Sequence, residues 1–592
     1  MKQFFGAFFG SILGILISTI VAVLIIAAVI TSSFKEAFKD NDNAIYKQKG
    51  KSILNLAFAG PVIDREKVNP FENIDLGPLA GDKGMGLNAI LKNLEKAKSD
   101  TAVKGLYLTF NGMMAGKSSA QDIRKGILDF KKSGKFVYAY AENYSQSEYY
   151  IASAADKVFL NPQGGMEWKG LNMSLMFYKK TLDKLGVDVQ IYRHGKFKSA
   201  IEPFMLDKMS EANRLQAETF LNSIWNNMVT EIAESRKTGV QVLNKLANEL
   251  AINFPEDAVS YKLVDELMYE DEVMNLLKKR VGVKEKDKLN LIAHSTYSKY
   301  KPSGQYLGKE KIAVIYAIGS ISSGEGSDDE IGSDRIAKAI KDAREDENIK
   351  AIVLRVNSPG GSALASDVIW REVNLAKKAK PFIVSMGDVA ASGGYYISCA
   401  ADRIFAEPNT ITGSIGVFGI VPNMKKALEE KLGITIDTVN TNSHSDVMST
   451  LRAATPTESV YIQKSVEKVY DVFITKVAEG RKITKDEVDS IGQGRVWSGT
   501  DALRIKLVDE LGGLPEAIAY AAKQAKLKEY KVTDLPTQKN PLDELLGKVE
   551  ADAETRLIKK HLGENYMYLK HVQNVIKAKG VQVRMPYEVI IH

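Results

Sequence analysis

The chain contains one long stretch of sequence twice, and this duplication constrains the possible folds more than any other feature. Residues 149–162 match residues 395–408 at a constant offset of 246 positions, and both copies read Tyr-Tyr-Ile, then Ala-Ala-Asp, then Pro. The hexapeptide Lys262–Leu267 recurs identically as Lys506–Leu511. Because solenoid repeats have much shorter periods, of about 20–50 residues, this duplication predicts two fused domains.

The two copies differ at the positions where chemistry is expected. Ser392, in the sequence Ala-Ala-Ser-Gly-Gly, corresponds to Gln146 in the first copy. The Asn-Ser-Pro-Gly-Gly segment 357–361 corresponds to Asn-Gly-Met-Met-Ala at 111–115. The first copy has therefore lost both features together, which predicts that only the second copy supplies a nucleophile.

Both halves read as strands that alternate with helices. Short apolar runs between amphipathic stretches are typical of parallel βαβ units, so the fold class is predicted to be α/β. The expected strands are residues 102–110, 135–140, 311–317, 351–356 and 382–386. The expected helices are residues 211–236, 334–345, 363–378, 457–481 and a helix that begins at Ser392.

An apolar segment precedes the repeats. No charged residue occurs from Phe4 to Phe34, and at about 1.5 Å per residue this run is long enough to cross a hydrocarbon layer of about 30 Å. A cleaved signal peptide is the alternative, but its apolar part is normally only about 7–15 residues long. We therefore expect an uncleaved transmembrane helix that anchors the protein to a membrane.

The expected organisation has four parts. Residues 1–34 form the anchor, residues 35–300 the first repeat, residues 301–525 the second repeat, and residues 526–592 a polar, helical tail. The repeats meet in a linker rich in Tyr, Lys, Gly and Pro, at about residues 295–308.

Composition excludes several classes of function. The net charge of +7 is spread along the chain without a basic block, which argues against a nucleic-acid partner. The single cysteine, Cys399, excludes an intramolecular disulfide and a zinc site with several thiolates, and its apolar neighbours predict a buried structural role. The histidines form no HExxH-type pair, so we expect neither a metal nor another cofactor.

Ser392 is the candidate nucleophile. It follows an expected strand and a Gly-Asp-Val-Ala-Ala turn and should open a helix, where its hydroxyl meets free N–H groups. The alternative is that Ser392 serves only as a helix N-cap. Gly360 and Gly361 follow another strand, at the sheet edge where backbone N–H groups could form an oxyanion hole, although Pro-Gly-Gly is also an ordinary tight turn.

A serine nucleophile needs a base, and no histidine has a suggestive position. A buried lysine with a lowered pKa can replace the histidine, and Lys198 in the segment Lys-Ser-Ala-Ile-Glu-Pro-Phe (198–204) is one candidate. From the residues alone, an ordinary solvated loop lysine remains the stronger interpretation.

Beyond the apolar segment, the chain resembles the long, duplicated form of the signal peptide peptidase A family of serine proteases. The resemblance rests on Gly-Asp-Val-Ala-Ala-Ser-Gly-Gly-Tyr-Tyr around Ser392, Asn-Ser-Pro-Gly-Gly-Ser before it, Thr-Gly-Ser-Ile-Gly at 412–416, and the Lys198 segment. It implies that Ser392 is the nucleophile, Lys198 the general base and Ser414 a residue that helps to hold the lysine amine. It further implies oxyanion donors from the backbone, here from the Gly360-Gly361 turn and Gly393.

The resemblance also implies properties of the whole molecule. It implies two tandem repeats of crotonase- and ClpP-like fold, four chains assembled into a bowl, and a single-pass protein of a bacterial inner membrane with its large domain in the periplasm. Counting positive charges beside the apolar segment gives the opposite orientation, because Lys2 stands alone before it and five lysines follow between positions 35 and 51. Large domains translocate largely regardless of charge, so we follow the resemblance.

The expected function is therefore an anchored endopeptidase with a Ser/Lys dyad that degrades the remnants of signal peptides and other hydrophobic peptides. Ile415, Val417 and Phe418 could line an apolar groove for them, although they read equally well as core. A crotonase-type acyl-CoA enzyme is an alternative function, but the sequence has no basic cluster that could bind the adenine nucleotide of coenzyme A. A non-catalytic membrane scaffold is the rival from another class.

Overall fold

The computed structural model describes residues 50–67, 84–300, 308–538 and 582–585, together with Gly14, Ser18 and Val21. The predicted anchor (1–34) lies outside the described residues except for these three, and so does most of the predicted tail (526–592). Among the residues described, no helix is both long enough and apolar enough to cross a membrane.

The first repeat is built on a seven-stranded sheet in which every pairing is parallel. Its strand order is β2-β1-β3-β4-β5-β7, and β8 also pairs with β1. The strands are β1 (Ser52–Ile63), β2 (Met85–Gly86), β3 (Val103–Met114), β4 (Phe136–Tyr144), β5 (Lys157–Met166), β7 (Glu266–Leu267) and β8 (Leu291–Ala293).

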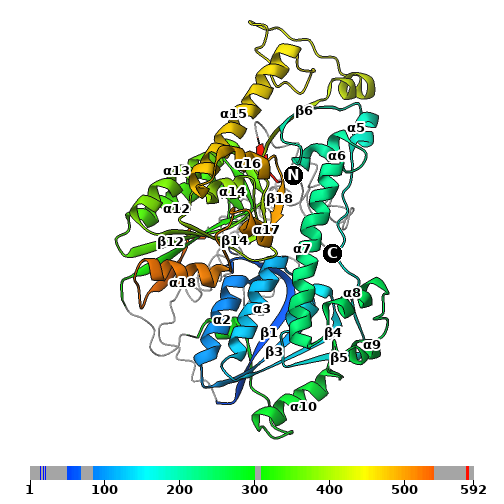
Figure 1. Cartoon of the computed structure of the whole chain (residues 1–592), viewed down its shortest axis with the longest axis vertical. Helices are drawn as coiled ribbons and strands as arrows, with labels where there is room; N and C mark the ends of the chain where they lie inside the picture. Colours follow the sequence, from blue (N-terminus) through cyan, green and yellow to red (C-terminus); the bar gives the residue numbers. More distant parts are fainter. Residues whose placement is uncertain are drawn as a thin grey trace, which may run out of the picture.

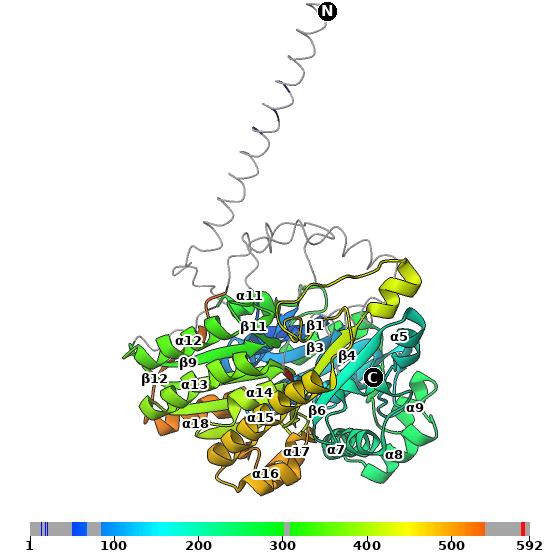
Figure 2. The same ribbon diagram turned by 90° about the horizontal axis from the view of Figure 1, so that it is seen from above.

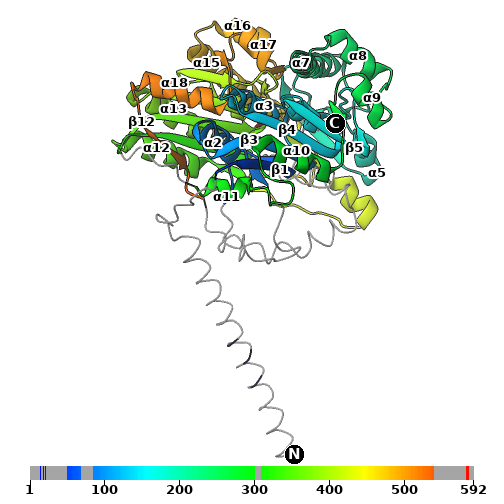
Figure 3. The same cartoon turned by 90° about the horizontal axis from the view of Figure 1, so that it is seen from below.

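Helices cover both faces of this sheet, which explains why its strands are apolar on both sides. Helix α7 packs into the larger core with β4, while α10 covers the opposite face, where Val273 and Leu277 meet Tyr107. Helices α7, α8 and α9 gather beside β4 and β5 (Figures 1 and 3). The helices are α2 (Leu87–Ser99), α3 (Lys117–Lys131), α4 (Gln146–Ala152), α5 (Lys179–Leu185), η2 (Ser199–Ile201), α6 (Glu202–Met205), α7 (Glu211–Arg236), α8 (Val240–Asn248), α9 (Pro255–Ser260), α10 (Glu270–Val281) and α11 (His294–Ser298).

The second repeat has an eight-stranded sheet of order β18-β16-β14-β12-β9-β20, with β15 and β19 off this path. Only the pairing of β16 with β18 is antiparallel in it. Helices α12 and α13 lie above β12 in Figure 1, and α18 lies below it. The strands are β9 (Lys311–Ile318), β12 (Ile349–Ser358), β14 (Phe382–Ala391), β15 (Arg403–Ala406), β16 (Ile411–Gly413), β18 (Val496–Ser498), β19 (Glu510–Leu511) and β20 (Lys531–Leu535).

The helices of the second repeat follow the order of the first. They are α12 (Ser333–Glu345), α13 (Ala363–Ala379), α14 (Gly393–Ser398), the π-helical turn η3 (Ala427–Lys431), α15 (Pro456–Arg481), α16 (Lys485–Ile491), α17 (Gly499–Arg504) and α18 (Leu514–Gln524). The long helices α7 and α15 begin at a capping hydroxyl, from Ser210 and Thr455, and end at a left-handed lysine. The predicted duplication therefore extends to the ends of individual helices.

A third sheet joins the two halves. Its order is β11-β10-β13-β21-β17-β6, and β6 comes from the first half while its neighbour β17 comes from the second. In Figure 2, β6 lies next to α15 of the second repeat. The strands are β6 (Asp188–His194), β10 (Ser320–Ser322), β11 (Glu330–Gly332), β13 (Gly360–Ser362), β17 (Val417–Asn423) and β21 (Gln582–Arg584).

The predicted α/β repeats are confirmed, and two local expectations are wrong. The strand predicted to end at Met386 continues to Ala391, because residues 389–391 pair in parallel with β16. The tail was expected to be helical from about residue 526, yet residues 531–535 form strand β20, which adds to the edge of the second sheet beside β9.

Candidate active site

Ser392 occupies a strained turn between a strand and a helix. It follows the last residue of β14 and precedes α14, with φ of 56° and ψ of −112°. A positive φ is uncommon for a residue with a Cβ and is typical of functional sites. The Ser392 N–H donates to the Gly413 carbonyl at 2.8 Å, while its side chain makes no capping bond to the helix. The N-cap interpretation therefore does not account for its hydroxyl.

Lys198 reaches this hydroxyl from the first half of the chain. Its Nζ lies 2.9 Å from Ser392 Oγ, and both side chains are fully buried. The lysine follows β6, whose seven pairs with β17 carry the end of the strand into the second repeat. The two residues come together across 194 positions of sequence.

Burial sets the charge state of Lys198. Loss of hydration lowers the pKa of the Lys198 amine well below its ordinary value of 10.5, and no carboxylate opposes this effect. A low pKa favours the neutral amine, which has a free lone pair. The buried lysine can therefore accept a proton from Ser392.

Ser414 stands beside Ser392 because their strands are neighbours. Strand β16 ends at Gly413, which pairs with Ala391, so each serine directly follows the end of its strand. The carbonyl oxygen and Oγ of Ser414 both lie 3.1 Å from Lys198 Nζ. These two acceptors fix the direction of the amine, and the third hydrogen-bond partner of Nζ is Ser392 Oγ.

Two glycines of the second repeat make room for the base. A Cβ on Gly494 would come within 2.6 Å of the backbone of Lys198, and a Cβ on Gly416 would come within 3.2 Å of its Cδ. The Phe197 N–H donates to the Gln493 carbonyl at 3.0 Å, so the loop of the base is bonded to the same segment. Sequence reasoning missed Gly494, for which the only signal was the Gly-Gln-Gly sequence at 492–494.

The predicted oxyanion residues gather on the other side of Ser392. The N–H of Gly360 donates to Ser358 Oγ at 3.1 Å, so Gly360 is not free to act as a donor. Its φ of 95° and its close approach to the backbone of Gly393 require a glycine, because a Cβ would lie 2.6 Å from Gly393 N. Gly361 and Gly393 remain the candidate donors, and Gly360 shapes the turn that presents them.

The position that corresponds to Ser392 in the first repeat holds no serine. Gln146 is buried, and its Oε1 accepts from the backbone N–H groups of Lys169 and Gly170, both at 2.9 Å. Ser445, at the position equivalent to Lys198, is exposed and donates to the Asn442 carbonyl. A lysine and a serine do meet beside Gln146, since Lys117 Nζ donates to Ser147 Oγ at 2.8 Å, but both residues come from the first repeat. The contact between Lys198 and Ser392 joins complementary halves.

Asp388 fastens the strand that carries the nucleophile to the first repeat, a role that the sequence did not reveal. Its carboxylate accepts from the N–H and the hydroxyl of Ser119 in α3, at 2.9 and 2.6 Å. Gly116 lets the helix approach this closely, since a Cβ there would lie 2.0 Å from Asp388. Burial raises the pKa of Asp388 above its usual range.

Cys399, seven residues beyond the nucleophile at the end of α14, is buried as predicted. Its Sγ donates to the Tyr396 carbonyl at 3.2 Å, and burial raises the pKa of the thiol to about 12. A thiol with so high a pKa stays protonated and is a poor nucleophile.

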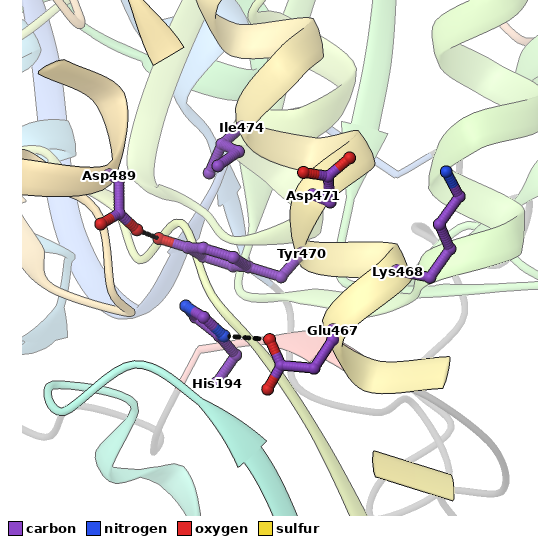
Figure 4. A pocket seen from close by; sticks show the side chains of 7 residues that line it. All are labelled: His194, Glu467, Lys468, Tyr470, Asp471, Ile474 and Asp489. Atoms are coloured by element: carbon purple, nitrogen blue, oxygen red, sulfur yellow. Dashed lines mark hydrogen bonds and ion pairs between the residues drawn. The ribbon is translucent and has the colours of Figure 1, made fainter. Parts of the chain in front are cut away.

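A hollow of about 520 Å³ opens at the surface where β6 meets α15 (Figure 4). The His194 ring stacks on Tyr470 with the centroids 3.7 Å apart, and Tyr470 donates to Asp489 at 2.6 Å. Tyr470 also accepts from the Gln493 N–H at 3.2 Å. This cluster therefore supports the loop that holds Lys198.

Comparisons with known proteins agree with the duplication. The family model described as Peptidase family S49 matches residues 129–284 and 374–528, one match in each half. The model described as Clp protease matches residues 309–412, in the second half. The solved structure of ClpP1 from Listeria monocytogenes covers 34% of this chain and 91% of its own, with 17% identity and a TM-score of 0.23, which is too low to support a conclusion.

Three relatives match along most of their length. "Protease 4" of Salmonella typhi is 36% identical over 90% of this chain and 88% of its own. "Protease 4" of Haemophilus influenzae is 39% identical over 72% of this chain and 71% of its own. "Serine protease SPPA, chloroplastic" of Arabidopsis thaliana is 34% identical over 90% of this chain and 77% of its own.

Proposed function

The chain belongs to peptidase family S49 and is a serine protease, and from this premise we propose that it is a membrane-anchored endopeptidase with a Ser/Lys dyad. Ser392 is the proposed nucleophile, and Lys198 the proposed general base. The proposed substrates are the remnants of cleaved signal peptides and other hydrophobic peptides.

The observation that carries the dyad is the buried contact of 2.9 Å between Lys198 Nζ and Ser392 Oγ. A lysine on the surface would be protonated at neutral pH and could not act as a base. Here burial lowers the pKa of the amine, and Ser414 holds it without adding a charge. The base, the nucleophile and the positioning residue thus each have a physical role.

The first stage of the reaction forms an ester between Ser392 and the substrate. The lone pair of Lys198 takes the proton of the Ser392 hydroxyl while Oγ attacks the scissile carbonyl. The N–H groups of Gly361 and Gly393 stabilise the oxyanion, and each such donor contributes about 3–4 kcal/mol in comparable sites. Lys198 then gives its proton to the leaving amine.

The second stage of the reaction hydrolyses the ester. A water molecule takes the place of the amine, Lys198 accepts its proton, and attack on the ester carbonyl forms the oxyanion again. When this intermediate collapses, Ser392 recovers its proton and the new carboxyl end leaves. No step needs a cofactor, because the lysine serves as both base and acid.

An anchor at residues 1–34 would hold the site close to a bilayer, where hydrophobic peptides concentrate. The mean hydrophobic character of this segment supports the anchor, and the family resemblance supports a large domain in the periplasm and a homotetramer. The count of lysines on either side of this segment predicts the opposite orientation, but it weighs less, since large domains translocate largely regardless of charge. We include a bacterial inner membrane, single-pass insertion and the tetramer in the proposal.

The test is hydrolysis of a hydrophobic fluorogenic peptide by the detergent-solubilised full chain. We expect Ser392→Ala and Lys198→Ala each to lower kcat by about a thousandfold or more, because nucleophile and base act as a unit. Ser398→Ala is the matched control: this buried serine bonds the Gly394 carbonyl within α14 and should keep wild-type activity. Equal rates for Ser392→Ala and wild type would contradict the proposal. A wild-type chain without activity on any peptide would favour the alternative function of a non-catalytic membrane scaffold.

A further inference from the structure

A buried pair of acids lies where helix α3 of the first repeat meets the second repeat. Asp122 belongs to α3, and Glu407 directly follows strand β15; both side chains are almost completely buried. Gly513 lies against both of them, since a Cβ on Gly513 would come within 1.7 Å of Asp122 Oδ1 and 3.1 Å of Glu407 Oε1. Helices α3 and α18 face each other across the same boundary (Figures 1 and 3). We call Asp122 and Glu407 the carboxyl pair.

The two members of the carboxyl pair are hydrogen-bonded to each other. An ionised carboxylate only accepts hydrogen bonds, so a bond between two carboxyl groups requires a proton on one of them. The proton belongs to the pair rather than to one residue, because two groups that interact this strongly titrate together. One proton and one negative charge therefore remain on the pair.

Other donors around the carboxyl pair are too few to stabilise two negative charges. Lys125 Nζ donates to Glu407 Oε1 at 2.7 Å. The Arg355 guanidinium reaches Asp122 at 3.4 Å, but it forms its shorter bond, of 2.8 Å, with Asp64. Within the part of the chain that the structure describes, no amine, amide or hydroxyl bonds the buried Oε2 of Glu407. An unsatisfied buried carboxylate oxygen is costly, so a proton is favoured there.

The surroundings of the carboxyl pair also favour this proton. Burial raises the pKa of Asp122 well above its usual range, and the neighbouring charge of Glu407 raises it further. Burial also raises the pKa of Glu407, although Lys125 opposes the effect. The charged or titratable groups that face the pair come from four elements: Lys125 in α3, Tyr150 in α4, Arg355 in β12 and Glu516 in α18. The two cations balance the negative charge that remains on the pair, and the carboxylate of Glu516 opposes a second one.

We propose that the carboxyl pair is a proton-binding site that locks the two repeats together, and that the lock loosens when alkaline pH removes the proton. Without the proton, two negative charges would face each other at the boundary with no donor between them. The lock lies close to the nucleophile, because Ser119, three residues before Asp122, bonds Asp388 in the strand that ends beside Ser392. Loosening it would move this strand away from the half that supplies the base.

Folding takes up one proton at this site. In the unfolded chain both acids are ionised above about pH 5, since their ordinary pKa values are about 3.9 and 4.3. The folded chain keeps one proton on the carboxyl pair. Between the ordinary pKa values and the raised pKa of the pair, the folding equilibrium constant therefore falls by up to about tenfold for each unit of rising pH. Above the raised pKa this loss of stability is complete.

The test is the pH dependence of guanidinium unfolding of the full-length chain in detergent, from about pH 6 to about pH 9. Asp122→Asn replaces the shared proton by a permanent N–H donor on a side chain of the same shape, which can bond Glu407 at every pH. We expect the wild-type chain to lose stability as the pH rises. Its folding constant should fall at least about threefold more per pH unit than that of Asp122→Asn.

Asp129→Asn is the matched control, because it is the same change in the same helix. The carboxylate of Asp129 bonds Lys98 at the surface, and this bond lowers the pKa of Asp129, so the group stays ionised over the whole range. This variant should keep the wild-type dependence on pH.

Equal dependence on pH in the wild type and in a folded Asp122→Asn variant overturns the inference. Glu407→Gln places the permanent donor on the other member of the pair, so it decides the question if Asp122→Asn does not fold. The wild type can also be measured without any substitution: an infrared spectrum at neutral pH with no absorption from a protonated carboxyl group overturns the inference as well. Neither measurement uses a peptide substrate, so failure of the lock leaves the proposed function standing.

Discussion

Lys198 is the residue at which burial has the largest chemical consequence. Lys198 is fully buried, with two oxygens of Ser414 and one of Ser392 around Nζ, and it favours its neutral form because burial removes the hydration that stabilises its charge. The same burial that makes the amine a base also makes the reaction sensitive to pH.

The first prediction is this pH dependence. The pKa of Lys198 in the folded protein is lowered, so protonation occurs only as the pH falls through that lowered value, and protonation removes the base. We expect kcat/KM to fall about tenfold per pH unit on the acid side and to level off above the pKa. A profile measured with a neutral peptide checks this, and a flat profile through the acid and neutral range would argue against a lysine base.

Ser414→Ala tests the orientation of the amine. The variant keeps the Ser414 carbonyl but loses Oγ, one of the two acceptors that direct Nζ. One such hydrogen bond is worth about 0.5–1.5 kcal/mol, so we expect kcat to fall by about tenfold while KM stays constant. Steady-state kinetics on the same peptide give both constants. A change confined to KM would mean that Ser414 contacts the substrate instead.

Sequence reasoning reached these side chains unequally. Ser392 and the glycines around it could be predicted from the contrast between the copies, because the first copy lacks them. Lys198 could not be distinguished from other lysines by its residues alone, and the family resemblance was needed to single it out. Its burial arises from contacts between segments 194 positions apart, and no local pattern encodes them.

At the scale of elements, the strand β6 and the loop after it determine whether a site exists. The strand pairs with β17, and the loop then packs on Gln493 and Gly494 of the other repeat. Gln216 of α7 adds a bond to the Ser199 hydroxyl at 2.7 Å, just beyond the base. The base is therefore held by both halves.

Gly494→Ala should displace this loop. The new Cβ would meet the backbone of Lys198 at 2.6 Å, so the lysine must move, and a misplacement of about 1 Å can cost a hundredfold in rate. We expect kcat to fall by about that factor while the protein remains folded, and peptide hydrolysis together with a melting curve checks both.

Gly433→Ala is the control for backbone strain. Gly433 also has a positive φ, of 67°, but nothing lies within 4 Å of the added Cβ. Gly433→Ala should lose only the stability that the positive φ costs, about 1 kcal/mol, and should keep its activity, while Gly494→Ala should lose more stability and also its activity. Equal activities would mean that the loop tolerates the shift.

The elements themselves were predicted better than their ends. The strands of the central sheets are short apolar runs with little ambiguity, and α7 begins and ends at the predicted residues. Strands β20 and β21 escaped prediction because each pairs with a partner far away in sequence and is short, five residues for β20 and three for β21. Pairing, rather than local preference, makes them strands.

At the scale of the whole molecule, buried ions join the two halves behind the active site. Arg355 of β12 is fully buried and bonds Asp64 of the first half at 2.8 Å, and a second carboxylate, from Asp122, lies 3.4 Å away. Burial alone would lower the pKa of Arg355, but the two carboxylates outweigh this effect and raise the pKa above its ordinary value. The ion pair holds β12, and with it the neighbouring strand β14, against the half that supplies the base.

Arg355→Met should break the ion pairs with Asp64 and Asp122. The change leaves the buried carboxylate of Asp64 without its cation, which typically costs about 3–5 kcal/mol. We expect a large fall in the midpoint of guanidinium unfolding and a loss of activity below that midpoint as the halves loosen. Arg504→Met, at an exposed arginine, is the control and should cost less than about 0.5 kcal/mol. A variant as stable as the wild type would show that the halves do not depend on this pair.

The central claim is that a base from one repeat activates a nucleophile from the other. The most direct measurement is the rate at which a fluorophosphonate labels the full-length chain, followed by peptide mapping, for wild type and Lys198→Met between pH 5 and pH 9. We predict that the label lies on Ser392, that its rate in the wild type rises with pH, and that Lys198→Met labels at least a hundredfold more slowly without a pH dependence. Labelling of another residue, or equal rates in the two proteins, would contradict the account.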